Sequence, residues 1–143
     1  MIIQQTRELQ EILRCLPFES EIRKRGRSRE RLKDMLVYIT SQLENPLFRF
    51  WIAYRSEDKI KPDDDILGYC IATINLIPGM KGIYIYRIYA KGNGLRKEFE
   101  KILKTWAKEY NIKNELITIY KNVKAFKRKH GFTATSVNME RRI

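Results

Sequence analysis

The sequence has 143 residues, of which 43% are hydrophobic and 11% aromatic, and this composition excludes a disordered chain. We expect one folded domain spanning residues 1–143, because this length leaves little room for a second. Lys and Arg number 29 against 17 Asp and Glu, so the formal net charge is +12. This excess favours an anionic partner, such as nucleic acid, an acidic surface or a phosphate-rich cofactor, although a solvated surface would also explain it.

The cysteines and the N-terminal segment indicate the cellular compartment in which we expect the protein. Cys15 and Cys70 are predicted to be small buried hydrophobes rather than a disulfide, which fits a reducing compartment. The single histidine, His130, cannot complete a metal site with them. Met1–Gln10 lacks an apolar signal segment, and no apolar run approaches the length of a membrane span. We therefore expect a cytoplasmic protein with no membrane segment and no bound metal.

The first third of the chain predicts a short strand followed by two helices. Ile2–Gln4 has strand character, and Thr6 is the predicted N-cap of a helix that Pro17 ends. A basic loop is predicted at Arg23–Arg27, and Ser28 is the predicted cap of the second helix. The apolar faces of the two helices are Leu9, Ile12, Leu13 and Leu16, and then Leu32, Met35, Leu36, Ile39 and Leu43.

Three strands are predicted in the middle of the chain, and they are rich in Ile and aromatic residues. They cover Leu47–Tyr54, Ile66–Ile77 and Ile83–Ala90. A polar loop separates the first two, and Pro78-Gly79 forms the turn between the last two. Together these three strands suggest an antiparallel meander.

A glycine-rich turn then leads into a long amphipathic helix. The apolar face of this helix is Leu95, Phe99, Ile102, Leu103, Trp106 and Tyr110. A strand at Leu116–Tyr120, a short helix at Val123–Lys129 and a strand at Phe132–Met139 are predicted to follow. Strand, helix and strand form a β-α-β unit, so we predict an α+β fold with a mixed, mostly antiparallel sheet flanked by helices.

The turn itself, Lys91-Gly92-Asn93-Gly94-Leu95-Arg96, is suited to binding an anion. The first N–H groups of a helix have no partner within the helix, and glycine lets a phosphate approach the backbone closely. Lys91 and Arg96 add full positive charges, so a pyrophosphate is a plausible ligand. The alternative is a plain tight turn. The turn is not a Walker A loop, because no G-K-[ST] follows it, and it lacks the third glycine of the dinucleotide-binding fingerprint.

Read with its neighbours, the turn resembles the coenzyme A binding motif of GNAT-type N-acyltransferases, [RQ]-x-x-G-x-[GA]. The strand before it and the amphipathic helix after it occupy the places that the family gives them. Downstream, Asn122-Val123-Lys124-Ala125 and Gly131-Phe132 are similar to the Asn-x-x-Ala and Gly-Phe segments of the family. Arg96 departs from the motif, because the family has a small residue at that position, and Lys91 replaces the usual Arg or Gln.

The resemblance implies an acyl-CoA site with acetyl-CoA or another acyl-CoA as the donor. The backbone of Ile88, Tyr89 and Ala90 would contact the pantetheine arm, and the turn would hold the pyrophosphate through backbone N–H groups. The residues expected to bind the coenzyme are Ile88, Tyr89, Ala90, Lys91, Gly92, Asn93, Gly94, Leu95, Arg96 and Asn122. Ile88–Ala90 and Leu116–Tyr120 would splay apart and leave a notch for the thioester.

The resemblance also implies where a general acid and a general base would stand. A glutamate often serves as base on the strand before the turn, and the corresponding residue here is Tyr84. A tyrosine often serves as acid shortly before the Gly-Phe pair, and the corresponding residue here is Lys127. Tyr84, Tyr86 and Tyr120 are expected near the notch, with aromatic packing as the alternative role for each. The candidate catalytic residues are therefore Tyr84, Tyr120 and Lys127.

The leading hypothesis is an acyl-CoA-dependent N-acyltransferase, an acetyltransferase by preference, that acts on an unidentified amine. The net charge of +12 supports a second hypothesis, an enzyme similar to the phage Mom-type DNA modification proteins with nucleic acid as partner. A third hypothesis is a binding module that keeps the fold and has lost the chemistry, because both the expected glutamate and the expected tyrosine are replaced.

Overall fold

In the described part of the chain, five strands form one sheet in which strands adjacent in sequence are adjacent in space. The computed structural model describes residues 1–26, 28, 30–55, 65–116, 124, 128, 129, 131, 133, 141 and 142. The strands are β1 (Ile2–Thr6), β2 (Phe48–Tyr54), β3 (Ile66–Asn75), β4 (Gly82–Ala90) and β5 (Glu115–Leu116). β1 to β4 pair in antiparallel fashion, and β5 pairs parallel to β4. The predicted fold class, α+β with a mixed and mostly antiparallel sheet, is confirmed.

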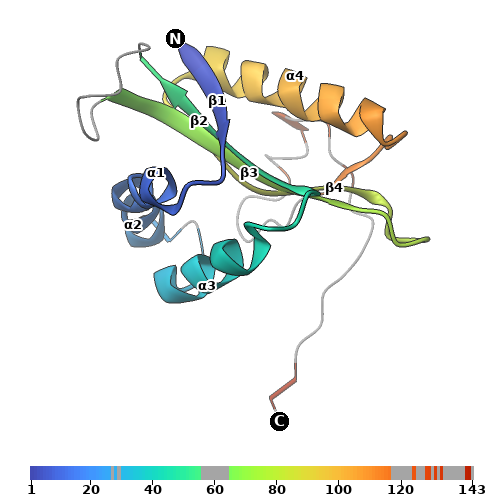
Figure 1. Cartoon of the computed structure of the whole chain (residues 1–143), viewed down its shortest axis with the longest axis horizontal. Helices are drawn as coiled ribbons and strands as arrows, with labels where there is room; N and C mark the ends of the chain where they lie inside the picture. Colours follow the sequence, from blue (N-terminus) through green and yellow to red (C-terminus); the bar gives the residue numbers. More distant parts are fainter. Residues whose placement is uncertain are drawn as a thin grey trace.

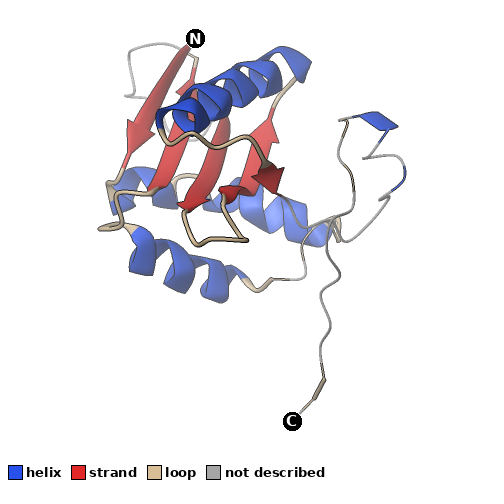
Figure 2. Ribbon diagram, turned by 90° about the vertical axis from the view of Figure 1, so that its right-hand side faces the viewer, coloured by secondary structure: helices blue, strands red, loops and turns tan. Residues whose placement is uncertain are grey.

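Helices cover both faces of the sheet, so the protein has three layers (Figures 1 and 2). The helices α1 (Leu9–Leu13), α2 (Leu16–Lys24) and α3 (Leu32–Gln42) lie on one face. The long helix α4 (Asn93–Glu109) lies on the other face, as its single wide apolar stripe requires. Among the helices of the described residues, none has the length and apolar composition to cross a bilayer.

Each face of the sheet carries its own hydrophobic core, because side chains alternate between the two faces along a strand. On the α4 face, Phe99, Leu103 and Trp106 are fully buried against β2, β3 and β4. On the opposite face, Met35 and Ile39 of α3 are fully buried against the other set of strand side chains. The cysteines behave as predicted, since Cys15 and Cys70 are both free and buried in different cores.

Three local predictions in the N-terminal third were wrong. Thr6 ends β1 rather than capping a helix, and its Oγ1 accepts a bond of 3.1 Å from the Glu8 N–H. Pro17 opens α2, because the first turn of a helix tolerates a residue without an N–H, and α1 has already ended at Leu13. The predicted basic loop is shorter than expected, since Arg23 belongs to α2.

The helix predicted to start after Ser28, which is α3 in the structure, also begins later than predicted. Its N-cap is Arg31, and Ser28 instead accepts a hydrogen bond of 3.3 Å from the Glu30 N–H. Downstream of Leu116, the rest of the predicted strand, most of the predicted helix at Val123–Lys129 and most of the strand at Phe132–Met139 lie outside the described residues. These elements stay predictions.

Gly68 of β3 lets α4 approach the sheet at the start of the helix. A Cβ at this position would lie 2.3 Å from the Tyr89 carbonyl oxygen and 2.8 Å from the Leu95 side chain. We therefore expect Gly68→Ala to destabilise the fold by about 1–3 kcal/mol, as overpacking does in a filled core. Thermal unfolding followed by circular dichroism measures this loss.

The matched control is Gly94→Ala, because a Cβ there meets nothing within 4 Å and the residue lies within α4. The control should be neutral or stabilising by up to about 1 kcal/mol, since alanine is the better helix former. Equal melting temperatures for Gly68→Ala and the unmodified protein would contradict the close approach of α4 to the sheet.

Candidate functional site

The N-terminus of α4 is open at the glycine turn. Gly92 is the N-cap residue, with a φ of 99° that L side chains rarely adopt, and among the described side chains none caps the helix through a hydrogen bond. The first turn of α4 contains no acidic residue. A Cβ built at Gly92 or Gly94 would meet nothing within 4 Å, so open space lies beside both residues. The turn therefore offers first-turn N–H groups and the positive end of a helix to an incoming anion.

The side chains of the two basic residues of the turn, Lys91 and Arg96, interact with other residues of the protein. The Lys91 Nζ lies 5.1 Å from the centre of the Phe18 ring, and the Lys91 N–H bonds the Leu67 carbonyl at 2.9 Å. Arg96 forms an ion pair of 3.4 Å with Glu100, one turn further along α4. Burial raises the pKa of the Cys70 thiol, and the positive charge of Arg96 opposes this rise.

β4 contains a bulge in the middle of the strand. Ile71 of β3 pairs with Arg87, but the next β3 residue, Ala72, pairs with Ile85, so Tyr86 is an extra residue on β4. Tyr86 and Arg87 consequently both project toward α2 and α3, where Tyr86 packs in the core and Arg87 bonds a side chain of α2. Ile85 and Ile88 on either side of them pack on the α4 face.

The described part of β5 pairs with β4 before this bulge. The pairs are Ile83 with Glu115 and Tyr84 with Leu116, and the next residue of the chain lies outside the described residues. The predicted splay of the two strands therefore stays a prediction. Tyr84 is half-buried and stands opposite Thr73, whose hydroxyl lies 3.0 Å from the Tyr38 hydroxyl of α3.

The remaining predicted site residues fall into two groups. Ile88, Tyr89 and Ala90 form the end of β4 directly before the turn, where the resemblance requires them. The Tyr89 ring stacks on the Tyr69 ring, with 5.4 Å between ring centres. Tyr120, Asn122 and Lys127 lie outside the described residues.

A buried carboxylate that sequence reasoning missed stands over the bulge. Glu19 of α2 has no exposed side-chain surface, and it accepts bonds from Arg87 Nε at 2.8 Å, Tyr69 Oη at 2.9 Å and Arg23 at 2.7 Å. The signal was present in the sequence, because Glu19 lies four residues after Cys15 and three before Ile22, on the buried face of α2. Glu19 thereby joins α2 to β3 and β4.

A second carboxylate, Glu30, approaches the bulge from the segment between α2 and α3. Its Oε1 accepts a hydrogen bond from the Tyr86 hydroxyl and lies 3.5 Å from an Arg23 nitrogen. No sequence signal distinguishes Glu30 from the other surface glutamates, because its partner Tyr86 is far away along the chain. β4 has no acidic residue of its own, and Glu30 brings a carboxylate to it from the segment between α2 and α3.

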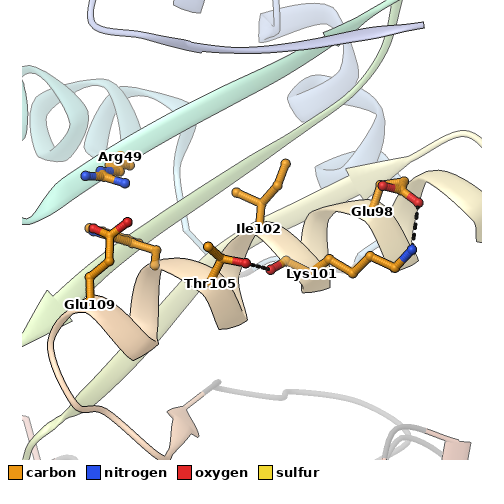
Figure 3. A pocket seen from close by; sticks show the side chains of 7 residues that line it. Arg49, Glu98, Lys101, Ile102, Thr105 and Glu109 are labelled. Atoms are coloured by element: carbon orange, nitrogen blue, oxygen red, sulfur yellow. Dashed lines mark hydrogen bonds and ion pairs between the residues drawn. The ribbon is translucent and has the colours of Figure 1, made fainter.

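An open groove of about 240 Å³ runs beside α4 on the other side of the sheet (Figure 3). Its lining residues are Arg49, Glu98, Lys101, Ile102, Thr105, Trp106 and Glu109. The Arg49 guanidinium carbon lies 4.6 Å from the centre of the Trp106 ring, and the predicted site residues that the structure describes do not line the groove. Within the described part of the chain, no group of three His, Cys, Asp or Glu residues could hold a metal ion.

Solved acetyltransferases share this architecture over nearly the whole chain. A predicted acetyltransferase of Clostridium acetobutylicum, solved with acetyl-CoA, is 21% identical, with 99% of this chain and 95% of that chain covered and a TM-score of 0.69. The aminoglycoside 6'-N-acetyltransferase AAC(6')-IG of Acinetobacter haemolyticus is 16% identical, with 100% and 99% covered and a TM-score of 0.69.

A third structure, AAC(6')-Iy in complex with the bisubstrate analogue CoA-S-monomethyl-acetylneamine, is 15% identical, with 99% and 97% covered and a TM-score of 0.62. No protein-family model and no curated protein sequence matches the chain. The chain has the fold of the GNAT acetyltransferases, so the resemblance drawn from the glycine turn is confirmed at the level of the fold.

Removing the buried carboxylate should destabilise the protein strongly. Glu19→Ala would leave Arg23 and Arg87 without their shared partner, and breaking a buried ion pair on one side costs about 3–5 kcal/mol. The control is Glu21→Ala, which removes an exposed carboxylate paired with Arg25 at 3.3 Å and should change stability by less than about 1 kcal/mol. Urea unfolding measures the stability of both variants. Equal unfolding midpoints for Glu19→Ala and Glu21→Ala would show that Glu19 does not hold the bulge.

Three tyrosines should ionise only when the protein unfolds. Burial, with a neighbouring glutamate in each case, raises the pKa of Tyr54, Tyr69 and Tyr86 well above the ordinary value. The unfolded chain releases these protons near pH ~10 while the folded chain keeps them, so stability should fall as the pH rises above about 10. Tyrosinate absorbance should show at least three of the eight tyrosines titrating together with unfolding. Full titration of all eight in the folded state would contradict this burial.

Proposed function

We propose that the chain is a single-domain N-acyltransferase that uses acetyl-CoA or another acyl-CoA to acylate an amine. The observation that carries this proposal is the open, uncapped N-terminus of α4 at Gly92–Gly94, directly after the bulged strand β4. The acetyl-CoA and CoA-derived ligands named for two of the solved structures of the same fold support the choice of donor.

The described residues fit the pyrophosphate of such a donor. The N–H groups of Gly94, Leu95 and Arg96 belong to the first turn of α4, where no acidic side chain opposes an anion. Open space beside Gly92 and Gly94 leaves room for phosphate oxygens against the backbone. Backbone groups of Ile88, Tyr89 and Ala90 would contact the pantetheine, and Asn93, Lys91 and Asn122 complete the proposed set.

The donor would supply an activated acyl group as a thioester, and the residues of this chain would bind and orient both reactants. The α2–α3 side of β4 is the side proposed for the acceptor, because Tyr84, Tyr86 and Arg87 project from β4 toward it. Tyr84, Tyr120 and Lys127 remain the residues proposed for proton transfer. Tyr84 is placed for this at the last described pair between β4 and β5.

A nucleic-acid acceptor stays a second proposal, supported by the net charge of +12. The outer surface of α4 contributes to this charge through the exposed side chains of Lys97, Lys101, Lys104 and Lys108. Binding to duplex DNA that weakens steeply as salt is raised would support this acceptor class, because phosphate contacts release counterions.

The variant Gly94→Glu tests the proposed donor site. A carboxylate placed beside the first turn of α4 would occupy the space left for the pyrophosphate and repel it, while the open surroundings leave the fold intact. We expect isothermal titration calorimetry to detect acetyl-CoA binding to the unmodified protein and at least about a hundredfold loss in this variant.

Gly94→Ala serves again as the control, because it adds a methyl group and no charge, and it should lose far less acetyl-CoA affinity than Gly94→Glu. Circular dichroism checks that all three proteins are folded. Unchanged affinity in Gly94→Glu would remove the pyrophosphate site from the turn. Absence of acetyl-CoA binding to the folded, unmodified protein would overturn the proposed function.

A further inference from the structure

Two carboxylates reach the bulge of β4, and their surroundings differ. Glu19 comes from α2 and bonds Arg87, whereas Glu30 comes from the α2–α3 segment and bonds Tyr86. Arg87 and Tyr86 are consecutive residues that the bulge directs to the same face. Pairs of carboxylates in unlike environments commonly take unlike roles.

Glu19 is fully engaged in holding the structure together. Both of its oxygens have partners, since Oε1 accepts from Tyr69 and Arg87 and Oε2 accepts from Arg23. Its side chain has no exposed surface, so a ligand cannot reach it without breaking the core. Its role is structural.

Glu30 is accessible, and the described residues contact only one of its two carboxylate oxygens. About 30% of its side chain is exposed, and both contacts given to its carboxylate by the described residues are made to Oε1. The contact to Arg23 is long at 3.5 Å, because Arg23 makes its shorter bonds of 2.7 and 2.8 Å to the Glu19 carboxylate and the Glu30 carbonyl. Oε2 of Glu30 therefore has capacity for a further donor.

A carboxylate oxygen with spare capacity suits a positively charged donor. The Tyr86 ring, whose hydroxyl bonds Glu30, packs against the Tyr38 ring with 4.9 Å between ring centres. Within this network, the charges of Glu19 and Glu30 balance those of Arg23 and Arg87.

We propose that Glu30 is the residue that recognises the acceptor, by binding a positively charged amino group next to the bulge of β4. This inference rests on the proposed function, because it assumes that the acyl donor lies along the C-terminal half of β4. Tyr86 is the first β4 residue toward α2 and α3 after the pair Tyr84–Leu116, and it orients the Glu30 carboxylate through its hydroxyl. The acceptor class is then a cationic amine.

The test uses two coenzyme A thioethers, S-(2-aminoethyl)-CoA and S-propyl-CoA, which differ in a terminal ammonium and need no known acceptor. Isothermal titration calorimetry should show S-(2-aminoethyl)-CoA binding about tenfold more tightly than S-propyl-CoA to the unmodified protein, the size of one charge-assisted hydrogen bond. In Glu30→Gln this preference should disappear while S-propyl-CoA affinity stays unchanged.

Two further variants keep the result interpretable. Glu21→Gln removes the same charge from an exposed position on α2 and should keep the tenfold preference. Tyr86→Phe keeps the Glu30 carboxylate and removes the hydroxyl that orients it, so the preference should fall but not vanish. Thermal unfolding confirms that each variant is folded.

The outcomes separate the two proposals. Equal binding of the two thioethers to the unmodified protein, or a preference that survives in Glu30→Gln, would overturn the role of Glu30 and leave the donor site standing. Failure of both thioethers and of acetyl-CoA to bind would overturn the proposed function and the role of Glu30 with it.

Discussion

The extra residue in β4 is the constraint on which the candidate site depends. Without the register shift at Tyr86, alternation along the strand would send Tyr86 and Arg87 to opposite faces of the sheet. With it, both reach α2 and the segment before α3, where buried Glu19 bonds Arg87 and accessible Glu30 bonds Tyr86. The same strand ends at the open N-terminus of α4, so one local irregularity links the proposed acceptor side to the proposed donor side.

The two faces of the sheet differ in the polarity of what they bury. The α4 face has an apolar core around Phe99, Leu103 and Trp106. Gly68 allows the start of α4 to lie against the sheet. The opposite face mixes a core with a polar network at its edge, and this edge is where side chains stay partly accessible. The groove beside α4 belongs to the first face and is separate from the network at the bulge.

The sequence predicted the elements that depend on local pattern. The meander, the glycine turn and the amphipathic helix follow from apolar period and turn chemistry, and their bounds shift by only a few residues in the structure. The break at Pro17 was misjudged, because proline can open a helix as readily as it ends one. The bulge and the approach of Glu30 could not be predicted, since they depend on strand register and on a contact between residues 56 positions apart.

The central claim is that acyl-CoA lies along the C-terminal half of β4 with its pyrophosphate on the first turn of α4. A crystal structure of the complex with coenzyme A tests this claim most directly. We expect phosphate oxygens at the N–H groups of Gly94 to Arg96 and the sulfur on the side of β4 where Tyr86 projects toward Glu30. Coenzyme A bound in the groove beside α4, or with its pyrophosphate away from the glycine turn, would contradict it.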